Sequence, residues 1–84
     1  MKLWILRPIN EDQGPWVPWY DKAFGFVVRA ETEDQARRFA HEMGADENRE
    51  EKGVNPWMDD ALSTCEDLDA DGSEGVVMSD FRAG

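Results

Sequence analysis

The chain has 84 residues, of which 19 are acidic and 9 basic, so its formal net charge is −10. This length predicts a single domain over residues 1–84 with a small core, to which the nine aromatic side chains must contribute much of the apolar surface. With one cysteine and one histidine, the chain cannot form an internal disulfide or a structural zinc site. No segment is apolar and long enough for a signal peptide or a membrane span. We therefore expect a cytoplasmic protein with no membrane partner.

The negative charge is concentrated in the second part of the chain. Residues 1–30 carry four basic and three acidic side chains, a net of +1, whereas residues 31–84 carry five basic and sixteen acidic ones, a net of −11. Such an acidic body repels nucleic acid and anionic membranes and attracts basic protein surfaces, including those that hold nucleic acid. The alternative is that the charge serves only to keep a small protein soluble.

The first 24 residues combine one strand with an aromatic, proline-rich segment. The apolar run from Leu3 to Leu6 predicts a buried strand, which Pro8 ends or marks as an edge. The segment 15–24 contains two prolines and therefore does not fit a central strand. Its aromatic side chains either cap the core or form a rigid surface for a partner, because Trp and Tyr are typical interface anchors.

Residues 25–44 predict a strand that leads directly into a helix. The run at 26–28 is aromatic and β-branched, Thr32 stands at an N-cap position with Gln35 three residues later, and Gly44 ends the helix. Four apolar residues recur at helical spacing and predict the buried face of this helix: Ala36, Phe39, Ala40 and Met43. Arg37 and Arg38 are expected on the solvated face.

The second half predicts a linker, a short helical turn and two strands. Residues 45–55 are mostly charged or small and indicate a solvated loop, after which Pro56 opens a turn whose Trp57, Met58 and Leu62 close the core. Strands are predicted at 63–68 and 74–81, joined by an Asp-Gly turn at 69–72. The predicted fold is therefore α+β, with a mostly antiparallel four-stranded sheet and one main helix packed on one face, in the order β-β-α-β-β.

Residues 67–72 match the first half of a calcium-binding EF-hand loop, with Asp67, Asp69 and Asp71 at alternate positions before Gly72. The match ends there, because position twelve is Met78 where a bidentate Glu is required, and the flanks predict strands. We therefore prefer an acidic hairpin turn and predict no metal or cofactor. A small metal- or ligand-binding domain that uses this turn is kept as an alternative.

The sequence contains no motif of an enzyme active site. A phosphate-binding glycine loop, a nucleophile elbow and an HExxH motif are all absent, and a pair of His41 with Cys65 would require the fold to bring them together. We therefore predict a protein without enzymatic activity.

Two segments resemble small proteins of phage and prophage type, residues 19–30 (WYDKAFGFVVRA) and residues 62–65 (LSTC). The step from strand to helix at Ala30 and Thr32 is also similar to the βαβ element of some anti-CRISPR proteins. The resemblance implies no fixed activity. It implies a mobile-element setting, in which small acidic proteins are often inhibitors that occupy a host protein's nucleic-acid-binding surface.

The resulting hypothesis is a binding protein that inhibits or adapts a host protein with a basic surface, such as a CRISPR effector, without contacting nucleic acid directly. Carboxylates in loops and turns would take the place of phosphates, and an aromatic loop would add apolar contact. A structural or assembly accessory protein, such as a homodimer paired through an exposed edge strand, is a further alternative. The predicted partner-binding residues are Trp16, Trp19, Tyr20, Glu47, Glu50, Glu51, Asp59, Asp60, Asp67, Asp69 and Asp71.

Overall fold

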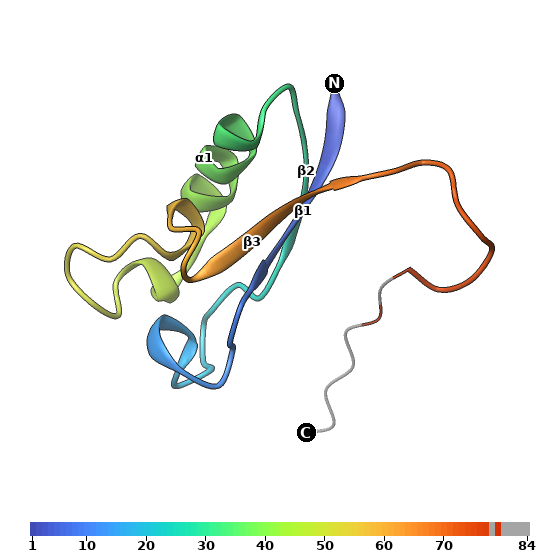
Figure 1. Ribbon diagram of the computed structural model, residues 1–84. Coiled ribbons are helices and arrows are strands. Elements are labelled where there is room, and N and C mark those ends of the chain that lie inside the picture. The colour runs from blue at the N-terminus through green and yellow to red at the C-terminus, as the bar shows by residue number, and fades with distance from the viewer. Residues whose placement is uncertain (78, 80–84) are drawn as a thin grey trace.

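Three antiparallel strands form the sheet of the computed structural model, which describes residues 1–77 and 79 (Figure 1). The strands are β1 (Lys2–Pro8), β2 (Phe26–Ala30) and β3 (Ser63–Leu68), in the order β2-β1-β3. The first strand is therefore central, in agreement with its apolar sequence. In the register Leu6 lies opposite both Phe26 and Cys65.

The predicted fourth strand is wrong over the part of it that the structure describes. Residues 74–77 and 79 join no strand, and residues 78, 80 and 81 lie outside the described residues. A hairpin after β3 would place the acidic residues 69, 71 and 74 beside Glu66 and Asp67 of the same strand, and like charges on neighbouring strands oppose pairing. Over the residues that the structure describes, the class is α+β, with one α-helix on a three-stranded antiparallel sheet.

The helix α1 (Glu33–Met43) packs on one face of the sheet and begins as its sequence predicts (Figure 1). Thr32 Oγ1 accepts a hydrogen bond from the Gln35 backbone N–H at 3.2 Å, and the Gln35 side chain accepts one from the Glu31 N–H at 3.1 Å. This arrangement is a capping box whose returning bond is shifted by one residue toward the N-terminus.

The buried face of α1 differs from the prediction. Ala36 and Ala40 are buried as expected, but Phe39 and Met43 are exposed, and Arg37 is only 6% exposed. The small alanine side chains let α1 lie close to the sheet, and the Arg37 side of the helix then faces the chain that leads into β3. The expectation that Arg37 is solvated is wrong, whereas Arg38 is exposed as predicted.

Two tryptophans from loops fill the space between α1 and the sheet. Trp16 ends the 3₁₀ turn η1 (Gly14–Trp16), and Trp57 lies in η3 (Pro56–Met58). Their rings meet edge to face at 5.4 Å, and Phe26 packs edge to face on Trp57 at 5.0 Å. Both tryptophans are fully buried, so the core depends on segments that are not strand or α-helix.

The other face of the sheet, which we call the open face, is not covered by α1. Because side chains alternate along a strand, Ile5, Val27 and Arg29 lie on this face while Leu6 and Phe26 face the helix. In Figure 1 the chain after β3 leaves the sheet on the side opposite α1. None of the helices in the described ranges has the length and apolar character needed to span a membrane.

Candidate functional site

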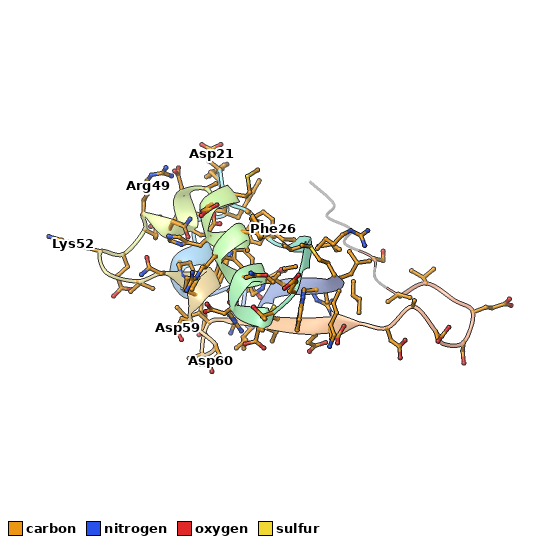
Figure 2. All side chains as sticks on the ribbon, turned by 90° about the horizontal axis from the view of Figure 1, so that it is seen from above. Asp21, Phe26, Arg49, Lys52, Asp59 and Asp60 are labelled. Atoms are coloured by element: carbon orange, nitrogen blue, oxygen red, sulfur yellow. The ribbon has the colours of Figure 1, made fainter. Side chains whose placement is uncertain are left out.

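An open groove of about 540 Å³ lies between the first turn of α1 and the chain around η3. Four carboxylates line it, two from the helix and two from the segment that follows η3: Glu33, Asp34, Asp59 and Asp60. We call this the acidic groove. Arg37, Asn55, the loop at Gly53 and Val54, and the Met58 side chain complete its lining. In Figure 2 Asp59 and Asp60 lie together at the outer edge of the molecule.

Local structure explains why these carboxylates lie where they do. Glu33 and Asp34 occupy the first turn of α1, where the helix dipole favours negative charge. Asp59 accepts a hydrogen bond from the Ala61 N–H at 2.9 Å, and its carbonyl accepts one from Ser63 N–H at 3.0 Å. The chain before β3 is thus a hydrogen-bonded turn, and the two aspartates are held on a fixed backbone.

Arg37 joins the two walls of the acidic groove. Its Nη1 donates to the Trp57 carbonyl at 3.0 Å and to Ser63 Oγ at 2.9 Å, and its Nη2 donates to the Ser63 carbonyl at 3.1 Å. Its Nε donates to Glu33 Oε2 at 3.3 Å. This buried guanidinium is therefore satisfied by groups from α1, η3 and β3, and it fixes the spacing between the helix and the turn.

The acidic groove keeps a negative charge after these pairings. Asp34 pairs with Arg38 at 2.9 Å on an exposed helix surface, where such a pair is weak. Asp60 makes no ion pair or side-chain hydrogen bond with any residue in the described ranges. Four carboxylates against the single guanidinium of Arg37 in the lining leave a surface that attracts a cationic group.

Glu47, one of the predicted partner-binding residues, is buried and does not lie on the surface as expected. It lies in η2 (Asp46–Asn48) and is fully buried. Its carboxylate accepts hydrogen bonds from Trp57 Nε1 at 2.6 Å, from the Ala23 N–H at 3.0 Å and from the Ala45 N–H at 3.1 Å. Three donors compensate the lost hydration of the carboxylate, so Glu47 joins three segments of the fold.

The aromatic loop divides into a buried and an exposed part. Trp16 is buried and its Nε1 donates to the Ala23 carbonyl at 2.8 Å, so this side chain takes the core position that was one of the two alternatives for the aromatic segment. Trp19 and Tyr20 are each 65% exposed, and their rings stack at 4.7 Å with an interplanar angle of 28°. These two side chains form an exposed aromatic pair, and their role in binding stays a prediction.

The other predicted acidic residues are exposed but dispersed. Glu50 pairs with Lys22 at 3.0 Å, and Asp67 pairs with Lys2 at 3.1 Å. Glu51, Asp69 and Asp71 lie elsewhere on the surface and line none of the acidic groove. Of the predicted set, the structure therefore brings only Asp59 and Asp60 together in this groove.

Glu33 and Asp34 were not predicted from the sequence to be groove residues. Their position after the cap explains them as helix-stabilising residues, and this role is correct as far as it goes. The available signal was Pro56 within a short turn, which indicates that the chain folds back before β3. The sequence does not specify that this return passes the first turn of α1.

The described residues contain no set of three or more His, Cys, Asp or Glu side chains arranged to hold a metal ion. In the segment 67–71, Asp67 pairs with Lys2, and Asp69 Oδ1 accepts a hydrogen bond from the Asp71 N–H at 3.0 Å.

Burial raises the pKa of the Cys65 thiol, an effect that the positive charge of Arg37 opposes and the charge of Glu33 reinforces. A raised pKa keeps this cysteine in its less nucleophilic, protonated form at neutral pH.

Comparisons of the chain with protein-family models, with curated proteins and with solved structures find no match.

Proposed function

We propose that this chain is a small, acidic, non-enzymatic binding protein of a phage or other mobile element, and that it inhibits or adapts a host protein by binding a basic surface. The observation that carries the proposal is the acidic groove, in which two separate segments supply four carboxylates. Such a groove suits a Lys or Arg side chain of a partner, because this side chain offers a positive charge and several hydrogen-bond donors.

The geometry of the acidic groove favours binding over mere solubility. Val54 and Met58 provide apolar contact for the aliphatic stem of a basic side chain, whose charged end can then meet Asp59 or Asp60. The buried contacts of Arg37 hold both walls in place before a partner arrives. Little ordering is then needed on binding, which favours affinity.

A nucleic-acid-binding protein is the proposed class of partner. Its Lys and Arg side chains normally face phosphates, and carboxylates on a compact body can compete for the same groups. The exposed pair of Trp19 and Tyr20 offers a second, apolar contact, since such side chains often anchor interfaces. Inhibition by occupation of the nucleic-acid site is the proposed consequence of such binding.

The first test is a tagged capture from host lysate, followed by charge reversal. We expect a nucleic-acid-binding protein to be enriched at low salt and released by added oligonucleotide. The variant Asp59→Lys/Asp60→Lys should bind it at least about tenfold more weakly, because two favourable charge contacts become repulsive.

The matched control is Asp12→Lys/Glu42→Lys, which changes the net charge by the same amount at exposed positions outside the acidic groove and outside the predicted partner-binding set. Retained binding by this control, with circular dichroism showing that both variants fold, supports the groove as the site. Equal weakening by both pairs would indicate attraction by net charge alone. Unchanged binding by the groove variant would contradict the proposal.

A further inference from the structure

The strand β2 is an edge of the sheet, with β1 on one side and no strand of the described part of the chain on the other. Edge strands leave a row of N–H and C=O groups that can pair with a further strand. On the open face of β2, Val27 is 57% exposed, and Arg29 makes no ion pair with a described residue. A hollow of about 290 Å³ beside Arg29 and Ala30 leaves room next to the strand.

The chain itself contains a segment that complements this edge. After β3, residues 69–77 run exposed and belong to no helix or strand (Figure 1). Val76 and Val77 are 85% and 83% exposed, and Glu74 is exposed two residues before Val76. Val76 and Val77 are β-branched residues of the kind enriched in strands, but the segment has no partner strand within the described residues.

We propose that residues 73–77 of a second copy of this chain add to β2 as an antiparallel strand. If Glu74 pairs with Arg29, Val76 lies opposite Val27 and Val77 lies opposite Phe26. This follows because the residue numbers of paired positions in two antiparallel strands always add up to the same value. The first two pairs then lie on the open face, one joining opposite charges and the other joining two β-branched side chains. Cross-strand pairs of both kinds stabilise sheets.

The charges favour β2 over β3 as the acceptor of this segment. The exposed side chains of Glu66 and Asp67 lie on β3, the opposite edge of the sheet, and they would repel Glu74 of an added strand. Arg29 on β2 has the complementary charge. The contact is separate from the acidic groove, so the loss of either one would leave the other intact.

A second copy, rather than the same chain, is the proposed donor. The segment leaves the sheet at Leu68 and extends away from it on the side opposite α1 (Figure 1). Two copies related by a twofold axis would each donate residues 73–77 and accept the same residues from the partner, so the contact forms twice. The five residue-to-residue steps from Leu68 to Ser73 can span about 17 Å when extended, which allows the exchange between neighbouring copies.

The test is the dissociation constant of the dimer of the full chain, measured by analytical ultracentrifugation. We expect a reversible dimer, weakened about tenfold by Arg29→Glu and likewise by Glu74→Arg, because each reverses a charge in both copies of the contact. The double variant Arg29→Glu/Glu74→Arg has the original net charge and should restore the dimer. The control Arg7→Glu alters an exposed arginine on the central strand and should leave the dissociation constant unchanged.

A cross-link identifies the donor of the strand. Val27→Cys/Val76→Cys, made together with Cys65→Ala, should give a disulfide-linked dimer on mild oxidation. An internal disulfide in a monomer would overturn the proposal, because the same chain would then supply the strand. A chain that stays monomeric at hundreds of micromolar, or a dimer that Arg29→Glu leaves unchanged, would overturn it as well.

Discussion

At the scale of single residues, two charged side chains connect the loops to the core. Glu47 gathers donors from Trp57, Ala23 and Ala45, and Arg37 donates to Trp57 and Ser63. The two groups thus hold Trp57 from opposite ends, one at its indole N–H and the other at its carbonyl. The most buried aromatic ring of the fold is positioned by two hydrogen-bonded charges.

Replacement of Glu47 by glutamine should destabilise the protein by about 2–3 kcal/mol, because the new amide has one acceptor oxygen where the carboxylate has two. The side chains have nearly the same shape, so the loss reports hydrogen bonding and not packing. Urea denaturation measures it. Glu51→Gln, at an exposed position, is the matched control and should change stability by less than about 0.5 kcal/mol. Equal stability of the two variants would show that the Glu47 contacts contribute little.

The burial of Arg37 and Glu47 could not be predicted from their own neighbourhoods. Glu47 lies between two polar residues and Arg37 stands beside a second arginine, and at such positions a charged side chain is normally solvated. Their partners lie far along the chain: Ser63 is 26 residues from Arg37, and Ala23 is 24 residues from Glu47. Burial of these charges is a tertiary property, which a local pattern does not contain.

At the scale of elements, the start of α1 was the most predictable feature, because a cap is local in sequence and structure. Thr32→Ala should remove the bond from Thr32 Oγ1 to the Gln35 N–H and destabilise the protein by about 1 kcal/mol, a fall in melting temperature of about 4–8 °C. Thermal denaturation followed by circular dichroism measures this change. Thr32→Ser keeps the hydroxyl and should retain most of the stability, so an equal loss in both variants would contradict the capping role.

The orientation of α1 was less predictable than its start. Phe39 and Ala40 are adjacent in sequence and were both assigned to the buried face, yet only Ala40 is buried. Trp16 and Trp57 already fill the space between the helix and the sheet. The helix therefore packs on the sheet through Ala36 and Ala40, and Phe39 is left exposed. Three strands were predicted correctly, two of them from apolar runs and β3 from a mostly polar sequence before an acidic turn, whereas Val76 and Val77 join no strand despite their β-branched side chains.

At the scale of the whole molecule, half of the carboxylates in the acidic groove were predicted and half were not. Asp59 and Asp60 follow from their place in an acidic turn. Glu33 and Asp34 reach the same groove only because α1 packs beside η3, a contact that the order of elements does not specify. The acidic character of residues 31–84 was visible in the sequence, but the meeting of these four carboxylates at one groove was not.

The net charge of −10 acts on the stability of the folded chain as well as on its partners. Most of the ion pairs seen are exposed and weak, so repulsion among the 19 acidic groups should outweigh them. Salt screens this repulsion within a Debye length of about 8 Å at 0.15 M. We therefore expect the melting temperature to rise by about 5 °C between 10 and 200 mM NaCl, equivalent to roughly 1 kcal/mol.

Calorimetry at one low protein concentration checks this expectation and separates screening from salting-out. Screening saturates once the Debye length falls below the spacing of the charges, so the rise should level off above about 0.2 M. A rise that continues linearly would indicate exclusion of salt from apolar surface instead. A fall in melting temperature over the same range would show that the ion pairs stabilise the fold by more than the repulsion among the carboxylates destabilises it. The pairs concerned are those of Lys2, Lys22, Arg38 and Arg49.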